Sequence, residues 1–463
     1  MATSTLPRPQ RAADLDRSST GADRARRPGS AGSAHSTRRP AIVGTLALGA
    51  LVAGMALLAL STASAPSAAV AEARPHFFPA WLAGPLRGLG PTISLGALEV
   101  LVVAICGCYL VALRCASAIP SRRLWGAIVS AHAAALLAPP LFSGDVFGYI
   151  GFARLDVLHG LSPYVHTAAA APGDPIYHLL GWTTLTTPYG PLFTLLGDAL
   201  VPFGIAGGLW ALKAIAALTS IATVALIWRA APRMGRSPRS AIAFYGLNPV
   251  VLVFAVAGAH NEALIGMFVA AGALCVVAGQ EARGGIALVV AAAIKASAAL
   301  AIPFALLGAR RRGRAGAAVA ASVVVVSVIA VIAFGPHLFG LAGALFTQQE
   351  KVAGHSVPAQ VSQLLGLGQL APAVRVAFLV VFGATAAVAL WRTWRGANWL
   401  DSYGWTTLAL LAATVWLVPW YGLWALLPAS LGSSRRLRIA TLIACGYLVA
   451  MRIAIQHPLS AGQ

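Results

Sequence analysis

Long apolar runs alternate with short basic clusters along the chain from residue 41 onward. Ala41–Ala63, Thr92–Leu113 and Ile205–Trp228 are apolar over lengths that match the roughly 20 residues a helix needs to cross a bilayer core. Other runs, such as Pro191–Val201, are too short to cross comfortably. The pattern predicts an all-α polytopic membrane protein, a bundle of about 11–13 apolar helices of which several do not span.

Arginine clusters mark the ends of many of these runs. Short basic loops of this kind face the cytoplasm under the positive-inside rule. Following the spans between them places two polar loops on the other side of the membrane, residues 143–204 and 335–372. We therefore expect a multi-pass protein of the plasma membrane with a cytoplasmic N-terminus and two extracytoplasmic loops. The clusters are Arg122-Arg123, Arg229–Arg239, Arg310–Arg314, Arg392–Arg395 and Arg435–Arg438.

The composition supports the membrane class and excludes others. Of the 463 residues, 58% are hydrophobic and 10% are charged, whereas a soluble domain carries about 25% charged residues. The net charge of +20 lies largely in the N-terminal tail and the short clusters, so we expect no nucleic-acid partner. The five cysteines lie in or beside apolar runs without metal-ligand spacing, which is typical of small buried residues.

The chain is expected to consist of a disordered tail and a folded transmembrane domain. Residues 1–40 are rich in Arg, Ser, Ala, Gly and Pro, which predicts a disordered basic cytoplasmic tail able to contact anionic lipid. Residues 41–463 form the transmembrane domain. A cleaved signal peptide is an alternative for the first apolar run, but the preceding tail is long for one, so a retained span is favoured.

Charged residues inside apolar runs raise two structural hypotheses. Arginines flank Gly285–Leu307 on both sides and Lys295 falls in its middle. We favour a re-entrant pair broken near Lys295; the alternative is that the positive-inside rule fails here. Glu99 and Lys213 each fall about two turns from the outer end of their runs, and buried charges are usually paired or functional. We hypothesise that these two residues pair.

The first external loop contains the most informative acid, Asp145, a few residues beyond an apolar run and beside Phe142 and Tyr149. A carboxylate partly dehydrated by such neighbours can act as a general base. The sequence Ser143-Gly144-Asp145 is equally consistent with a helix N-cap. The residues alone leave both interpretations open.

Other polar groups at expected external positions suggest binding roles. His260, Asn261 and Glu262 suit hydrogen bonds to a hydroxyl-rich or phosphate group better than a metal site, because no second ligand pair stands nearby. In the second loop, Lys351 and His355 can neutralise a phosphate, or the loop is simply solvated.

Arg154 and the aromatic residues leave similar alternatives. Arg154 is expected on a solvated helix surface or as a further cation for a phosphate. Trp420-Tyr421 can stack on a sugar or anchor an aromatic belt, and Tyr164 follows a turn at the membrane border.

Six motifs in order resemble the GT-C superfamily glycosyltransferases, and among them the polyprenol-phosphate-mannose-dependent α-1,6-mannosyltransferases that extend the backbone of lipomannan and lipoarabinomannan. The resemblance covers roughly residues 41–455. The motifs are SGDVFGYIGFARLDVLHGLSPYVH (143–166), TPYGPLF (187–193), LNPVVLVFAVAGAHNEAL (247–264), AIKASAALAIPF (293–304), HSVP (355–358) and PWYGLWALLP (419–428).

The resemblance implies an inverting transfer of mannose from polyprenyl-phosphate-mannose to a lipid-linked mannan acceptor, without a metal or other cofactor. It implies that Asp145 is the catalytic base, although Gly144 stands where many superfamily members have a second acid. Alternatives are another sugar or acceptor within the superfamily, a secondary transporter or a non-catalytic scaffold. The expected substrate-binding residues are Tyr149, Arg154, Tyr164, Tyr189, His260, Asn261, Glu262, Lys351, His355, Trp420 and Tyr421.

Overall fold

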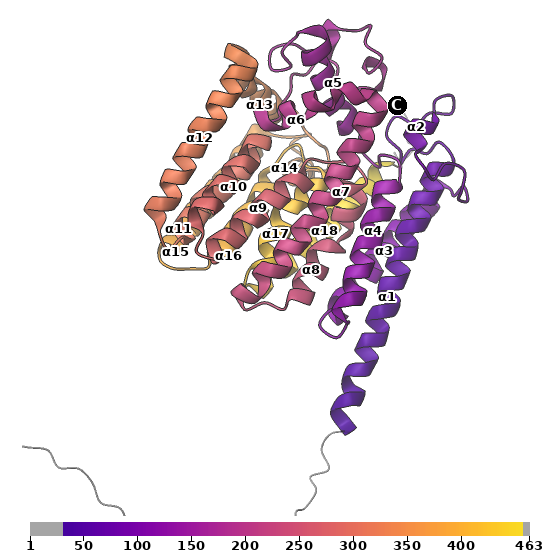
Figure 1. Cartoon of the computed structure of the whole chain (residues 1–463), viewed down its shortest axis with the longest axis vertical. Helices are drawn as coiled ribbons and strands as arrows, with labels where there is room; N and C mark the ends of the chain where they lie inside the picture. The colour runs from indigo at the N-terminus through magenta and orange to yellow at the C-terminus, as the bar shows by residue number, and fades with distance from the viewer. Residues whose placement is uncertain (1–30, 457–463) are drawn as a thin grey trace, which may run out of the picture.

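The computed structural model describes residues 31–456, and this part of the chain is helical with connecting loops (Figure 1). No β-strand forms among these residues, where only two isolated bridge pairs occur. The predicted all-α class is confirmed. The α-helices are α1 Ala31–Ser64, α2 Ala80–Ala83, α3 Leu95–Cys115, α4 Ser121–Leu137, α5 Asp145–His159, α6 Pro191–Leu200, α7 Gly204–Ala230, α8 Pro238–Gly246, α9 Glu262–Val277, α10 Glu281–Ile294, α11 Ala301–Gly308, α12 Arg312–Phe334, α13 Gly340–Glu350, α14 Val357–Leu364, α15 Pro372–Trp394, α16 Trp399–Ala413, α17 Leu423–Leu431 and α18 Arg435–Gln456.

Five helical stretches in the described part are long and apolar enough to cross a bilayer, which establishes a multi-pass membrane protein. A sixth is added if α8 and the π-helical segment η5 (Val250–Val256), which meet at a bend of 44°, count as one span. Pro249 lies at this bend, and its missing N–H is a common cause of a helix break. The five stretches are Arg39–Ser64, Leu95–Cys115, Pro191–Met234, Arg312–Glu350 and Pro372–Trp394.

The expected N-terminal tail falls only partly within the described residues. Residues 1–30 lie outside them. Residues 31–40 belong to helix α1, which begins ten residues before the apolar run expected at Ala41. Helix α1 packs along α3 and α4.

The segment from 285 to 307 breaks at Lys295, as predicted. Helix α10 ends at Ile294, Lys295 is extended (φ −153°, ψ 129°), and a short 3₁₀ turn, Ala296–Leu300, leads into α11. The break meets the loop 143–204, which is expected to be external, because the N–H of Gly190 donates to the carbonyl of Ile294 at 2.9 Å. Helix α10 therefore presents Lys295 to that loop.

The predicted pairing of Glu99 with Lys213 is wrong. Lys213 is fully buried in α7, and its Nζ donates to the carbonyl oxygens of Ala135 at 3.1 Å and Ala257 at 2.8 Å. Among the described residues Lys213 makes no ion pair. Backbone dipoles take the place of a counterion, and the lysine ties α7 to α4 and to the loop after η5.

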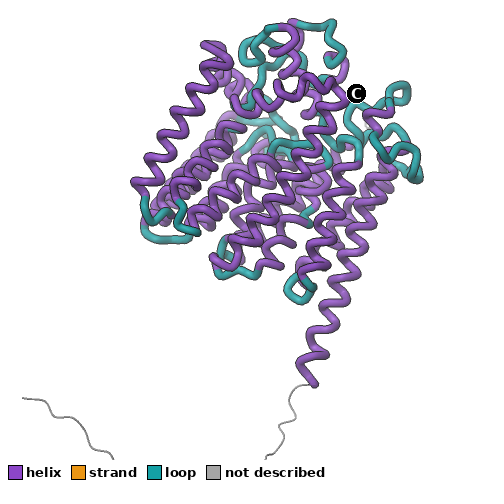
Figure 2. The backbone as a smooth tube through the Cα atoms, viewed as in Figure 1, coloured by secondary structure: helices purple, strands orange, loops and turns teal. Residues whose placement is uncertain are grey.

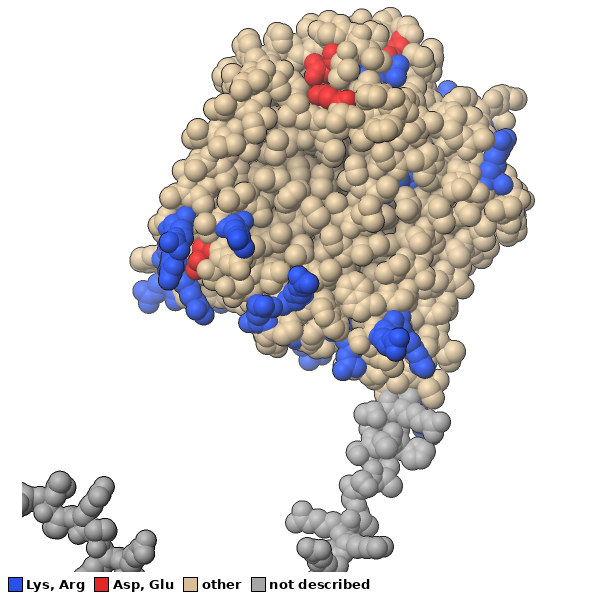
Figure 3. Space-filling view, in the orientation of Figure 1, with Lys and Arg blue, Asp and Glu red and all other residues tan. Residues whose placement is uncertain are grey.

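The molecule has two chemically different ends. On the face seen in Figure 3, Lys and Arg side chains crowd the end at which α1 begins, and Asp and Glu cluster at the opposite end. Most of the longer loops also gather at that opposite end, around α2, α5 and α6 (Figure 2). The expected external loops 143–204 and 335–372 meet there, and so does the site described below.

Candidate active site

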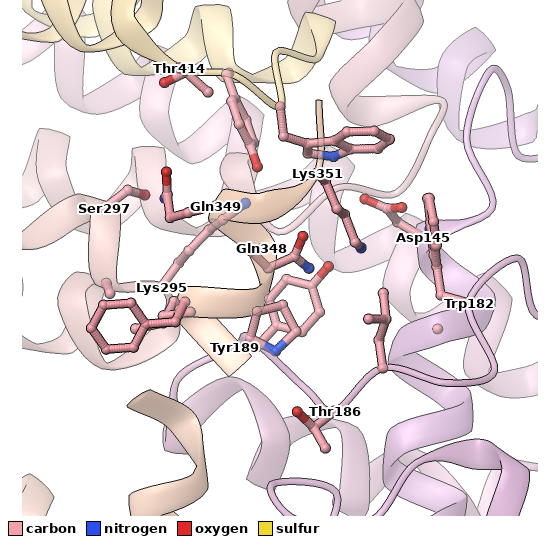
Figure 4. Close-up of a pocket in the computed structure, with 18 of the residues that line it drawn as sticks. Asp145, Trp182, Thr186, Tyr189, Lys295, Ser297, Gln348, Gln349, Lys351 and Thr414 are labelled. Atoms are coloured by element: carbon pink, nitrogen blue, oxygen red, sulfur yellow. The ribbon is translucent and has the colours of Figure 1, made fainter. Parts of the chain in front are cut away.

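A cavity of about 570 Å³ lies between the two expected external loops (Figure 4). Its walls come from α5, the loop before α6, the start of the 3₁₀ turn Ala296–Leu300, helix α13 and the segment that joins α16 to α17. The walls mix charged, amide and aromatic groups, which suits a ligand with hydroxyl groups and a negative charge. The polar and aromatic residues lining it are Asp145, Phe152, Trp182, Thr186, Tyr189, Lys295, Ser297, Phe346, Gln348, Gln349, Lys351, Thr414, Trp416, Trp420, Tyr421 and Trp424.

Asp145 is the first residue of α5 and faces this cavity, with 26% of its side chain exposed. Its carboxylate does not cap the helix. The capping position belongs to Gly144, and the Asp145 N–H donates instead to the Ser143 hydroxyl at 3.1 Å. Of the two interpretations left open by the sequence, the N-cap is not supported, and the carboxylate stays available to a ligand.

Three backbone contacts fix the turn that carries Asp145. Phe142 adopts a left-handed conformation (φ 61°), which is uncommon for a bulky residue. Its N–H donates to the carbonyl of Ala69 at 2.8 Å, and its carbonyl accepts from the Arg452 guanidinium at 2.5 Å. The N–H of Leu141 donates to the carbonyl of Ala257 at 3.2 Å. Segments far apart in sequence thus hold the carboxylate in place before any substrate arrives.

The electrostatics of Asp145 suit a base. Burial raises the pKa of its carboxyl to about 6, even though part of the side chain faces the cavity. The Lys295 and Lys351 ammonium groups lower this pKa, while the Glu262 carboxylate raises it. A carboxylate with a pKa closer to neutrality accepts a proton more readily than an ordinary Asp and is still largely ionised at pH 7.

His260 lies behind Asp145 and is fully buried. Its Nδ1 is 3.7 Å from the Asp145 Oδ2, and its ring stacks on Trp420 with 3.6 Å between centroids. Burial, followed by the charge of Lys295, holds the pKa of His260 well below its usual range. The imidazole is therefore neutral and brings no positive charge to the site. It packs Trp420 against the Asp145 side of the cavity.

Lys295 supplies a cation that was not among the expected binding residues. Its Nζ lies 2.5 Å from the Glu262 Oε1, and the rings of Tyr189, Tyr421 and Trp424 surround it with centroids 4.7–5.8 Å away. Burial lowers the pKa of Lys295, but the Glu262 carboxylate, with smaller contributions from Tyr421 and Asp145, opposes burial, and the pKa is raised overall. Glu262 therefore keeps a fixed positive charge on the cavity wall.

Lys351 is the second cation of the cavity, as expected from the sequence. Its Nζ lies 3.9 Å from the centroid of Trp182 and 5.6 Å from that of Trp416. Figure 4 shows its side chain extending toward Asp145 from the end of α13. Burial lowers the pKa of Lys351 and the Asp145 carboxylate opposes this effect. The two tryptophans were missed from the sequence, because loops distant in the chain bring them together.

Four aromatic residues from the expected set also form this site. Trp420, Tyr421 and Tyr189 line the cavity, so Trp420-Tyr421 is no simple membrane-belt anchor. Tyr149 lies one layer behind: its ring packs edge-on against Tyr189 at 4.9 Å between centroids, and its hydroxyl is 3.5 Å from the His260 Nδ1. Tyr149 supports the site rather than lining it.

Four more of the expected residues do not line the cavity. Arg154 forms a bidentate ion pair with Asp174 at 2.9 and 3.0 Å, so its guanidinium is directed at Asp174. Tyr164 is buried and its hydroxyl bonds Thr194 at 3.0 Å. The other two are His355, whose Nε2 lies 2.7 Å from the Leu417 carbonyl, and Asn261, which is buried behind the cavity wall.

No three His, Cys, Asp or Glu side chains within residues 31–456 are placed to share a metal ion. The expectation that this chain needs no metal stays a prediction, because the structure carries no test of it.

Comparisons with known proteins agree with the motifs. A family described as "Alpha-(1->6)-mannopyranosyltransferase, N-terminal domain" matches residues 46–312. Alpha-(1->6)-mannopyranosyltransferase A of Corynebacterium glutamicum is 32% identical over 36% of this chain, and its namesake in Mycobacterium tuberculosis is 29% identical over 65%. Alpha-(1->6)-mannopyranosyltransferase B of C. glutamicum is 25% identical over 68%.

These alignments do not span the relatives completely. They cover 35%, 64% and 59% of the length of those three proteins, in the order named above. No solved structure matches this chain. The family match extends over more than half of the sequence and includes Asp145, His260, Glu262 and Lys295. On this ground the chain belongs to the alpha-(1->6)-mannopyranosyltransferase family.

Proposed function

We propose that this chain transfers mannose from polyprenyl-phosphate-mannose to a mannan acceptor, forming an α-1,6 linkage with inversion at the anomeric carbon. The observation that carries the proposal is one cavity in which a dehydrated carboxylate, Asp145, faces two ammonium groups, Lys295 and Lys351. Family membership supplies the sugar and linkage through the names of the relatives, and favours a transferase over the transporter considered from the sequence.

The chemistry needs one base and one anion site. The acceptor hydroxyl oxygen attacks the anomeric carbon and gives its proton to the Asp145 carboxylate. The bond between that carbon and the phosphate oxygen breaks, and its electrons leave with the polyprenyl phosphate. Because this phosphate departs as a stabilised anion, it needs little help from an acid. A β-linked donor gives an α-linked product.

The cations are suited to the departing group. Negative charge builds up on the phosphate as its bond to the sugar breaks, and fixed positive groups in a partly dehydrated cavity stabilise such charge strongly. Glu262 positions Lys295 through their ion pair, so little reorganisation is needed during the reaction. Lys351, close to both Asp145 and the aromatic residues at its end of the cavity, is the second such group.

The charge distribution supports the proposed orientation in the membrane. The crowded Lys and Arg side chains at the end where α1 begins suit the cytoplasmic surface under the positive-inside rule (Figure 3). The cavity at the opposite end then opens toward the extracytoplasmic leaflet, where a lipid-borne donor and a glycan acceptor can meet. A plasma-membrane location is part of this proposal.

The test is transfer by membranes that contain wild-type protein or Asp145→Asn, given labelled polyprenyl-phosphate-mannose and a mannoside acceptor. Loss of a general base lowers the rate by roughly 10²–10⁴-fold. Asp156→Asn is the matched control, since Asp156 lies on the same helix outside the cavity. Equal product from wild type and Asp145→Asn rules out the base. Undiminished transfer in EDTA is expected, and loss reversed by a divalent ion contradicts metal independence.

A further inference from the structure

A second, much smaller space adjoins the cavity near Lys295. It measures about 20 Å³, and we call it the annex. Its walls include Glu262, Ser297, Thr407 and Trp424, and two of these, Ser297 and Trp424, line the main cavity as well. About 10–15 Å³ of such space suffices for one water-sized group. The annex is therefore large enough for a single hydroxyl and too small for a sugar ring.

Three polar atoms of the annex residues have no hydrogen-bond partner among the residues that the structure describes. They are the Glu262 Oε2, the Ser297 Oγ and the Trp424 Nε1, and all three are buried. The other Glu262 oxygen is already used, since Oε1 bonds Lys295. Leaving a buried polar atom unpaired is unfavourable, and more so for a charged group, so three such atoms on residues around one space indicate a polar occupant.

The chemistry of the three atoms selects the occupant. A carboxylate oxygen only accepts hydrogen bonds, an indole N–H only donates, and a serine hydroxyl does either. A hydroxyl group meets both demands at once, because it donates to Glu262 and accepts from Trp424. A phosphate oxygen is repelled by the carboxylate, and a metal cation leaves the indole N–H facing a positive charge.

We propose that the annex binds one hydroxyl group of the donor sugar and so contributes to the choice of sugar. This rests on the proposed function. The donor is favoured over the acceptor because Glu262, the ion-pair partner of Lys295 at the proposed phosphate site, lines the annex, and Ser297 lies across the cavity from Asp145 (Figure 4). In an in-line displacement the base and the leaving phosphate lie on opposite sides of the anomeric carbon, so the donor occupies the Lys295 side.

The experiment compares polyprenyl-phosphate-mannose with analogues that lack one sugar hydroxyl each. Wild type and Trp424→Phe are assayed with every donor. A site built around a hydroxyl rejects the analogue without it by up to roughly 10⁴-fold. We expect one deoxy analogue to be a poor donor for wild type, and Trp424→Phe to slow the natural donor while leaving that analogue unchanged. The matched control is Trp405→Phe, outside the annex. This variant should keep the wild-type ratio of the transfer rates with the natural donor and with the deoxy analogue.

The outcomes separate the two proposals. If no polyprenyl-phosphate sugar is a donor for wild type, the proposed function fails. If the natural donor works and all deoxy analogues work equally well, the annex proposal is overturned. The same follows if Trp424→Phe slows every donor by the same factor, which indicates an ordered water or a packing role. Monodisperse elution of each variant in detergent shows that folding is intact.

Discussion

The Lys295 ammonium lies 2.5 Å from the Glu262 carboxylate and joins the end of α10 to the start of α9. The Glu262 side chain is fully buried, whereas 15% of the Lys295 side chain faces the cavity. The acid is thus held inside the protein and the cation is presented to the ligand. A pair with this asymmetry can serve both the fold and the reaction, and the two contributions are separable by mutation.

Removing only the cation should harm both contributions. Lys295→Met leaves the Glu262 carboxylate buried and unpaired, a situation that costs about 3–5 kcal/mol. Adding Glu262→Gln removes the stranded charge, so the double variant should melt closer to wild type than Lys295→Met does. Both variants should remain defective in transfer, because both lack the Lys295 ammonium group that is proposed to stabilise the departing phosphate. Thermal unfolding in detergent and the mannosyl-transfer assay measure the two effects; recovery of transfer in the double variant contradicts the role of Lys295.

Transfer should depend on pH through Asp145. Because burial raises the pKa of its carboxyl to about 6 and the base acts when ionised, kcat/KM should rise with pH up to about 6 and level off above. A pH–rate profile on purified enzyme measures this. An acidic limb centred near the ordinary Asp value of about 4 is the contrary result.

Ionisation of the Asp145 carboxyl, which should raise the rate of transfer, should lower the stability of the fold. A carboxyl whose pKa is raised by folding binds its proton more tightly in the folded state. Ionisation of Asp145 therefore lowers the free energy of unfolding as pH rises from about 4 to about 6. Asp145→Asn should remove this decline. The melting temperature of the variant should therefore rise relative to that of wild type as the pH increases over this range. Identical pH dependence of wild type and Asp145→Asn contradicts the assignment.

Arg154 should prove structural. Its guanidinium is held by Asp174, which also accepts from His159 at 2.8 Å and from the Ile176 N–H at 2.9 Å. Arg154→Gln should lower the melting temperature by loosening the loop after α5, while the pH profile of transfer keeps its midpoint. A normal melting temperature with a raised KM for the donor indicates instead that Arg154 contacts phosphate.

The features set by local sequence were predictable. The run Ile205–Trp228 anticipates α7 to within two residues at each end, because length and apolarity alone decide a span. The apolar run Ala241–Ala257, in contrast, is not one straight helix, because it bends between α8 and η5. Asn248-Pro249 is the sequence feature that indicates this bend. Pro249 has no backbone N–H to donate to a helical hydrogen bond, and the Asn248 side chain accepts from the Val250 N–H at 2.9 Å.

Only the part of the site that depends on a single residue and its local sequence could be predicted. Asp145 stands out because acids are rare in this chain and the motif around it is characteristic. Lys295 was seen only as a break in an apolar run, since its partner Glu262 lies 33 residues away and their contact is tertiary. Burial likewise decides that His260 is neutral, and no local pattern reveals it. Chemistry that depends on distant partners needs the fold.

Gly190 should be intolerant of any side chain. A Cβ atom there would lie 2.2 Å from the carbonyl oxygen of Ala293, a backbone atom that cannot move aside, in the turn of α10 just before Lys295. Gly190→Ala should therefore push the first external loop off α10, break the bond between Gly190 and Ile294, and reduce transfer together with stability. Gly173→Ala, in the same loop with open space around it, should change both by little. Melting temperatures and transfer rates of the two variants decide the matter, and equal behaviour would mean that the loop does not depend on this contact to hold the cavity wall in place.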